Sequence, residues 1–156
     1  MAQVNTLPSL VSHVLASPDR SHIAPRRGAI LVIEDRYDVR QGMAQLLELH
    51  GFLVVDASDG EQALGHLHTD PRGFALILLD LVMPGALTGN EFRSRQLSIP
   101  ELAEIPTIVV SATESDSLTR TELHPDAWIE KPFRFDDLLA IVKQYVTPEA
   151  GAMISE

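Results

Sequence analysis

The chain has 156 residues, of which 45% are hydrophobic and 22% charged, as in an ordinary soluble globular protein. Its net charge of -10 argues against a direct nucleic-acid surface, which needs a basic stripe, and the absence of cysteine excludes disulfides, thiolate chemistry and cysteine zinc sites. No apolar run approaches the roughly 20 residues of a membrane helix, and no basic region precedes an N-terminal apolar stretch, so the sequence predicts a cytoplasmic protein with no membrane partner.

Residues 1–27 are expected to form a partly flexible N-terminal extension. Three prolines and scattered serines interrupt this segment. Its apolar residues fit one face of a short, loosely attached helix that begins near Pro8. These residues are Leu10, Val11, Val14 and Leu15. The main domain is predicted over residues 28–147, followed by a C-terminal tail over residues 148–156.

Five short apolar runs are bounded by turn residues, a pattern that predicts strands buried in a parallel sheet. They are Ala29–Ile33, Phe52–Val55, Phe74–Leu79, Thr107–Val110 and Ala127–Ile129. Segments with helical patterning separate them, so the order is a strand and a helix repeated five times. This order predicts an α/β fold, a doubly wound (βα)5 sandwich with right-handed crossovers.

Local signals predict where the helices begin and end. Gly51 is expected to stop the first helix, and Ser58 with Glu61 fits a capping box for the second. The third helix is expected over residues 90–97, and the last from about Phe135.

The most buried strand is predicted to end in an aspartate. The six residues Phe74–Leu79 are all apolar, and Asp80 follows them directly. Open α/β sheets bind their ligands beyond the carboxyl ends of the strands, where this carboxylate would lie. A carboxylate there could also simply cap a turn, so the other strands have to decide its role.

Polar side chains follow four of the five predicted strands. They are Glu34, Asp35, Asp80, Ser111 and Lys131. Each has an ordinary explanation alone: Asp35 as a helix cap, Ser111 as a turn residue, Lys131 as a surface charge. The carboxyl ends of parallel strands share one edge of the sheet, however, so the five side chains are predicted to converge.

Three carboxylates in one crevice suggest phosphoryl transfer to a carboxylate. Glu34, Asp35 and Asp80 would repel one another unless a cation binds, and Mg²⁺ prefers such oxygen ligands together with phosphate oxygens. Asp80 can then act as the nucleophile and form an aspartyl phosphate. Lys131 supplies a positive charge for the phosphoryl oxygens, and Ser111 supplies a hydroxyl donor.

These residues lie in four motifs, ILVIED, LLDLVMP, IVVSA and WIEKPF, in this order along the chain. Together the motifs resemble the receiver domain of two-component response regulators, and the resemblance covers about residues 28–147. It implies a flavodoxin-like fold whose five-stranded parallel sheet has the order 2-1-3-4-5. It also implies a signalling module rather than an enzyme, one that works in phosphorelay signal transduction as a phosphoprotein.

The resemblance assigns a role to each residue of the crevice. Asp80 matches the phosphoacceptor and Lys131 the family's lysine. Asp35 matches the direct Mg²⁺ ligand, Glu34 a ligand that acts through water, and Val82 a ligand that uses its backbone carbonyl. All five roles are expectations from the resemblance.

The resemblance also implies a conformational switch. Ser111 matches the switch hydroxyl, and Trp128 stands where the family usually has tyrosine or phenylalanine. Pro132 matches a proline that often follows a cis peptide bond. On phosphorylation Ser111 would bind the phosphoryl group, and the aromatic ring would rotate inward. Because Trp128 is bulkier than the usual ring, it could instead stay outside or swing only partly, as a fixed surface-packing aromatic.

Three departures from the family pattern matter. The last two fall on the fourth helix, which by the resemblance forms the output surface together with the fifth strand and fifth helix. The usual Met-Asp-Gly after the third strand is Leu-Thr-Gly at residues 87–89, and the usual Gly-Ala before the aromatic residue is His-Pro at residues 124–125. The segment between Ser111 and Lys131 is also one or two residues short. Within it, residues 114–123 have few apolar side chains and predict a short, mobile helix.

The expected partners are a sensor histidine kinase or a histidine phosphotransfer protein, and an unknown downstream protein. The segments of 27 and 9 residues that flank the domain are too short for an output domain, so output is expected through protein contact or onward phosphotransfer. One alternative is a receiver-like binding module that is never phosphorylated. A phosphohydrolase of the haloacid dehalogenase type is disfavoured, because its second aspartate would stand where Val82 does. A flavin-binding protein of the same fold is not supported, because no phosphate-binding loop follows the first predicted strand.

Overall fold

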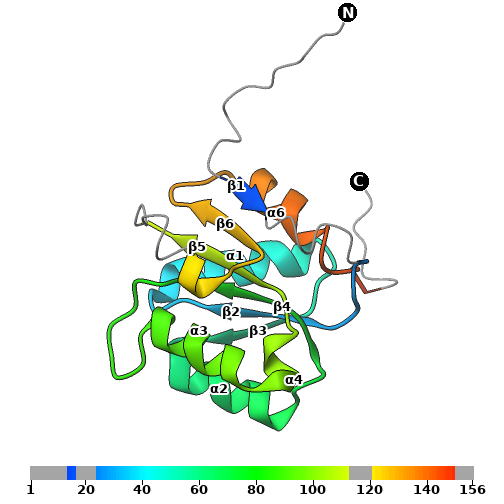
Figure 1. Ribbon diagram of the computed structural model, residues 1–156. Coiled ribbons are helices and arrows are strands. Elements are labelled where there is room, and N and C mark those ends of the chain that lie inside the picture. The colour runs from blue at the N-terminus through cyan, green and yellow to red at the C-terminus, as the bar shows by residue number, and fades with distance from the viewer. Residues whose placement is uncertain (1–13, 17–23, 113–120, 150–156) are drawn as a thin grey trace, which may run out of the picture.

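The computed structural model describes residues 14–16, 24–112 and 121–149. One sheet runs through the domain, and helices lie on both of its faces (Figure 1). The strands are β1 (Val14–Ala16), β2 (Ala29–Ile33), β3 (Val54–Ala57), β4 (Phe74–Leu79), β5 (Thr107–Ser111) and β6 (Ala127–Glu130). The helices are α1 (Tyr37–Leu49), α2 (Gly60–Thr69), α3 (Gly89–Ser98), α4 (Pro100–Ala103) and α6 (Phe135–Val142).

The strand order of the sheet is β1-β6-β5-β4-β2-β3. All pairs from β6 to β3 are parallel, so the five predicted strands have the predicted order 2-1-3-4-5. The predicted doubly wound, flavodoxin-like fold is confirmed. The sheet gains a sixth strand, β1, which pairs antiparallel with β6.

Alternating side chains of the central strands divide the core into two layers. On β2, Ile30 and Val32 pack with residues of α1 and α6, whereas Leu31 and Ile33 pack with residues of α2, α3 and α4. All six residues of β4 are buried, which explains their unbroken apolar run. The central strand therefore ends between two covered faces, and Asp80 follows it directly.

Several element ends differ from the prediction by one or two residues. The second predicted strand begins at Val54 rather than Phe52. Asp59, not Ser58, caps α2, because its side chain accepts a hydrogen bond from the backbone N–H of Gln62. Gly51 does end α1, with a positive φ of 91°. α3 begins at Gly89, one residue before the predicted start at residue 90, and a capping box at Thr88 precedes it.

The prediction of a helix near the N-terminus was wrong for the residues that the structure describes. Val14–Ala16 form a strand, and Leu10 and Val11 lie outside the described residues. A short apolar run fits either a helix or a strand. A strand at this position pairs with the backbone groups along the edge of β6, whereas a helix would leave those groups unpaired. Within the predicted short helix of residues 114–123, residues 121–123 are helical, while residues 113–120 lie outside the described residues.

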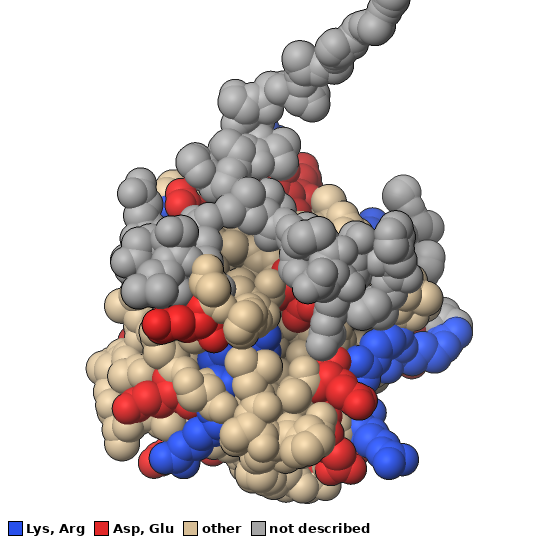
Figure 2. Space-filling view, in the orientation of Figure 1, with Lys and Arg blue, Asp and Glu red and all other residues tan. Residues whose placement is uncertain are grey.

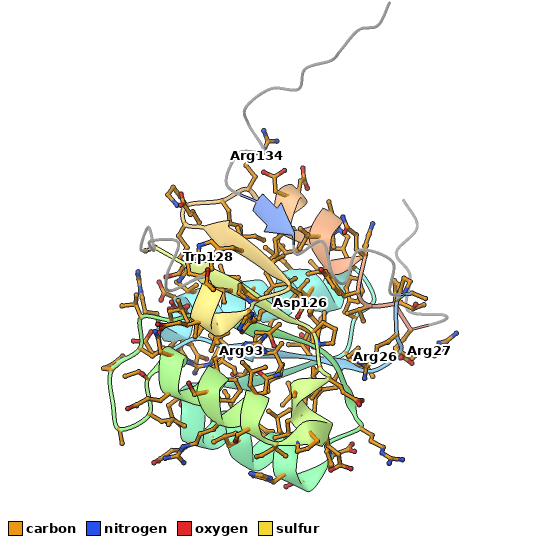
Figure 3. The ribbon with its side chains drawn as sticks, viewed as in Figure 1. Arg26, Arg27, Arg93, Asp126, Trp128 and Arg134 are labelled. Carbon is orange, nitrogen blue, oxygen red and sulfur yellow. The ribbon has the colours of Figure 1, made fainter. Side chains whose placement is uncertain are left out.

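A buried arginine ties α3 to the chain segment that enters β6. Arg93 is 2% exposed and donates from Nε to the carbonyl of Leu123 at 2.8 Å and from Nη2 to the carbonyl of His124 at 2.7 Å. Its Nη1 donates to Gln96 Oε1 and to Thr107 Oγ1, both at 2.8 Å. Figure 3 shows Arg93 reaching from α3 toward β6. The guanidinium thus binds carbonyls at the end of the helical turn of residues 121–123.

Replacing Arg93 with lysine should lower the free energy of unfolding by about 2 kcal/mol, because a single ammonium cannot reproduce this fork of hydrogen bonds. Urea unfolding followed by circular dichroism measures the loss. Arg95→Lys is the matched control, since Arg95 is exposed on the same helix and should lose little. Equal stabilities of the two variants would contradict this role for Arg93.

Candidate functional site

The sheet register brings the predicted site residues to one edge. Asp80 follows β4 and donates its backbone N–H to the carbonyl of Ile33 on neighbouring β2 at 3.1 Å, directly before Glu34. On the other side, Lys131 follows β6 and donates its N–H to the carbonyl of Ser111, the last residue of β5, at 2.9 Å. The convergence inferred from parallel strand ends therefore holds for the backbone at these positions.

Three carboxylates form a compact acidic cluster there. Glu34, Asp35 and Asp80 each offer one oxygen, and these oxygens lie within 4.8 Å of one another. Glu34 is 2% exposed and Asp80 5% exposed, whereas Asp35 is half-buried. Carboxylates this buried require a cation or a proton to offset their repulsion.

Lys131 supplies one positive charge to the cluster. Its Nζ lies 2.9 Å from Glu34 Oε1 and 3.5 Å from Asp80 Oδ2. The side chain is 21% exposed, so part of the ammonium remains open to solvent. One lysine facing three carboxylates leaves the cluster with excess negative charge.

The excess charge and the burial affect the protonation of Asp80. Burial, and to a smaller extent a hydrogen bond with Glu34, raise the pKa of Asp80 to about 7. The backbone N–H of Val82, which lies 3.0 Å from Asp80 Oδ1, and the charge of Lys131 lower the pKa but do not cancel the effect of burial. A bound divalent cation would favour the ionised carboxylate.

The cluster fits Mg²⁺ in chemistry. Carboxylate oxygens are the hard ligands that Mg²⁺ prefers, and three of them lie within 4.8 Å of one another here. Lys131 engages Glu34 more closely than Asp80, at 2.9 Å against 3.5 Å, which suits a role for Glu34 through water rather than as a direct ligand. Asp35 and Asp80 are then the side chains best able to hold the ion.

The loop after β4 packs closely against the start of α3. A Cβ on Gly89 would lie 2.6 Å from the carbonyl oxygen of Asp80 and 2.5 Å from Leu81 Cα, so only glycine fits. Val82 on this loop is 56% exposed at the edge of the cluster. Its backbone carbonyl as a metal ligand stays a prediction.

The two predicted switch residues are both buried. Ser111 is 0% exposed at the end of β5, and Trp128 is 1% exposed in a small cluster with Val109 and Leu123. The peptide bond between Lys131 and Pro132 is cis, as the resemblance implied. The ring of Trp128 is thus already packed inward in this state.

Sequence reasoning missed an arginine behind the acidic pair. Arg40 on α1 donates from Nη1 to the carbonyl of Glu34 at 2.8 Å and to that of Asp35 at 3.4 Å. Its Nε donates to Asp56 Oδ2 on β3 at 2.7 Å, and Gln41 Nε2 reaches the same oxygen at 3.2 Å. The sequence shows only that Arg40 lies one turn into a predicted helix. Its role depends on its contact with Asp56, which the sequence alone does not reveal.

Replacing Arg40 with methionine should weaken Mg²⁺ binding about tenfold, because the loop that carries Glu34 and Asp35 would lose its anchor. Isothermal titration calorimetry with Mg²⁺ measures this affinity. Arg36→Met is the matched control, because the side chain of Arg36 is 66% exposed in the same loop. Equal Mg²⁺ affinities for the two variants would show that Arg40 does not position the acidic pair.

The parallel strand order and the acidic cluster with its lysine define a flavodoxin-like α/β domain with a ligand crevice at the carboxyl ends of its strands. A family model described as "Response regulator receiver domain" matches residues 30–143, and the chain belongs to this family of two-component signalling modules.

Individual relatives agree with this assignment. The chain is 31% identical over 117 residues to the sensory transduction protein RegX3 of Mycobacterium tuberculosis, covering 74% of this chain and 49% of RegX3. The chain therefore spans about half the length of the curated relatives it matches. The chemotaxis protein CheY4 of Vibrio cholerae shares the fold, with a TM-score of 0.70, 24% identity and coverage of 78% of this chain and 100% of CheY4.

A third relative was solved with ligands. The response regulator TrrA of Thermotoga maritima, in complex with Mg²⁺-BeF, has a TM-score of 0.64 and 26% identity, and the match covers 74% of this chain and 96% of TrrA. The helices in the described part of the chain are too short or too polar to span a membrane.

Proposed function

We propose that Asp80 of this receiver domain accepts a phosphoryl group from a phosphohistidine in a Mg²⁺-dependent reaction. The observation that carries the proposal is that Lys131 Nζ lies 2.9 Å from Glu34 and 3.5 Å from Asp80, two members of the acidic cluster that also includes Asp35. This arrangement offers a buried carboxylate nucleophile, a cation site and a positive charge for the phosphoryl oxygens within one cluster.

The chain's residues divide the chemistry among them. An oxygen of ionised Asp80 attacks phosphorus, the phosphorus–nitrogen bond breaks, and the histidine nitrogen leaves with the electron pair, giving an acyl phosphate on Asp80. Lys131 donates hydrogen bonds to the phosphoryl oxygens, and Ser111 offers its hydroxyl.

The acidic residues would hold the metal. Asp35, Asp80 and the carbonyl of Val82 would bind Mg²⁺ directly, with Glu34 acting through water. When bound, Mg²⁺ reduces the repulsion between the acidic cluster and an anionic phosphodonor. The complex of TrrA with Mg²⁺-BeF supports this proposal by family likeness.

Ser111 and Trp128 are proposed to carry the response to phosphorylation. The new group adds about -1.5 to -2 charges next to the end of β5, where Ser111 can donate to it. Trp128 packs with Leu123 in one cluster, so a shift on β5 or β6 would reach the residues before β6. Trp128 would respond from a buried position, and a fixed packing role is the alternative for its ring.

A sensor histidine kinase or a histidine phosphotransfer protein is the proposed phosphodonor, and protein contact or onward phosphotransfer the proposed output. The net charge of -10 favours a protein partner over nucleic acid. On the face shown in Figure 2, acidic and basic side chains of the described residues are interspersed. The alternative is a phosphorylation-independent binding module.

Intact-protein mass after treatment with acetyl phosphate tests the proposal, with and without Mg²⁺. We expect one phosphoryl adduct that needs Mg²⁺ and is absent in Asp80→Asn. An adduct of equal yield in Asp80→Asn would reject Asp80 as the acceptor. No adduct on the native chain, with Mg²⁺ binding confirmed, would favour the phosphorylation-independent module.

A further inference from the structure

Arg40 is a nearly buried cation beside the acidic cluster, and the proposed phosphoryl chemistry makes no use of its charge. Its side chain is 11% exposed. Its Nη1 lies 2.8 Å from the carbonyl oxygen of Glu34 and 3.4 Å from that of Asp35, and the carboxylates of both residues belong to the cluster. Lys131 offsets only part of the cluster's negative charge, so a second cation this close is drawn toward the carboxylates unless another group holds it.

Asp56 is the carboxylate that holds this cation. Alternate side chains of a strand share a face, and Val54 packs against the core layer that contains residues of α1, so Asp56 faces α1 as well. Its Oδ2 accepts from Arg40 Nε at 2.7 Å and from Gln41 Nε2 at 3.2 Å. The group of carboxylates close enough to share a metal does not include Asp56. Its charge therefore holds Arg40 from outside the cluster.

We infer that Asp56 is a positioning residue that keeps the guanidinium of Arg40 out of the proposed Mg²⁺ site, an inference that rests on that site. With the carboxylate in place, Arg40 binds the loop through backbone carbonyls and leaves the side chains of Glu34 and Asp35 to the metal. Without it, Arg40 is an unpaired charge in a nearly buried position, which is costly. A change of side-chain rotamer then carries the guanidinium to the carboxylate of Asp35, where it competes with Mg²⁺.

A competing cation on the same chain lowers the apparent metal affinity through its population. If Arg40 occupies the cluster in about nine-tenths of molecules, about one-tenth remains able to bind Mg²⁺, and the apparent Kd rises about tenfold. Loss of the carbonyl contacts that anchor the loop adds about another tenfold, the effect expected for Arg40→Met. Removal of the Asp56 charge should thus weaken binding about a hundredfold, and a second substitution at Arg40 should recover about tenfold of this loss.

Isothermal titration calorimetry with Mg²⁺ on the full-length chain tests this inference with Asp56→Asn, Arg40→Met and the double variant. Asparagine keeps the size of aspartate and removes its charge, and Asp56 is 40% exposed on an edge strand, so the fold tolerates the change. Asp38→Asn is the matched control, because it removes one negative charge from a side chain that is 78% exposed and pairs with Arg36 at 3.8 Å. Its Kd should stay within about twofold of the native value.

We expect the Kd to rise about tenfold in Arg40→Met and about a hundredfold in Asp56→Asn, and to return to about tenfold in the double variant. Arg40→Met thus weakens Mg²⁺ binding in the native chain and strengthens it in Asp56→Asn, a reversal that a purely structural role of Asp56 does not produce. Native affinity in Asp56→Asn, or a double variant that binds no tighter than Asp56→Asn, would overturn this inference alone. A native chain that binds no Mg²⁺ would overturn the proposed function with it.

Discussion

Replacing Lys131 with alanine should slow phosphorylation of Asp80 by about 100-fold or more at saturating Mg²⁺. The ammonium lies within 3.5 Å of both Glu34 and Asp80, and a fixed positive charge at a developing phosphoryl group commonly contributes this much to a rate. Its loss also removes an interaction that lowers the pKa of Asp80, so less of the nucleophile is ionised near neutral pH. The rate of adduct formation with acetyl phosphate, followed by intact-protein mass, measures the effect.

Lys143→Ala is the matched control for this experiment. Lys143 is exposed directly after α6 and should leave the rate unchanged. Mg²⁺ affinity, measured on the same samples, separates a lost phosphoryl contact from a lost metal site. A Lys131→Ala variant that is phosphorylated as fast as the native chain would remove Lys131 from the mechanism.

Asp80→Asn should raise the free energy of unfolding by about 2–4 kcal/mol above pH 7 in the absence of divalent cations. Burial raises the pKa of Asp80 from 3.8 to about 7 in the folded chain, and a tenfold change in proton affinity corresponds to about 1.4 kcal/mol. The folded state therefore holds a proton that the unfolded state releases between these pH values, and native stability falls as pH rises through this window. Asparagine has no charge to bury.

The pH profile makes this prediction specific. The stability gap between Asp80→Asn and the native chain should be small below pH 4, widen up to about pH 7, and level off above it, as measured by urea unfolding in EDTA. Mg²⁺ should narrow the gap, because it favours ionised Asp80. Asp38→Asn, at a side chain 78% exposed, is the control and should show no such widening. A gap that is independent of pH would contradict the raised pKa.

The parallel core and the main site were predictable because each depends on short local patterns. Unbroken apolar runs marked the five parallel strands, and their common direction placed Glu34, Asp80 and Lys131 at one edge. No long-range side-chain contact had to be guessed. The signal for Asp80 was the fully buried strand directly before it.

The features that the sequence did not reveal depend on partners far along the chain. Arg93 is buried only because carbonyls some 30 residues away face it, and Arg40 acts through Asp56 on another strand. β1 forms because the β6 edge pairs with it, although the local pattern fits a helix equally well. Tertiary context decided each of these cases.

The central claim is that the phosphoryl group resides on Asp80, and borohydride reduction tests it most directly. The native chain is treated with acetyl phosphate and Mg²⁺, reduced so that an acyl phosphate becomes an alcohol, digested, and mapped by tandem mass spectrometry. We predict a single reduced residue, the homoserine derived from Asp80. Reduction at Glu34 or Asp35, or at no carboxyl group in a chain that binds Mg²⁺, would contradict the account.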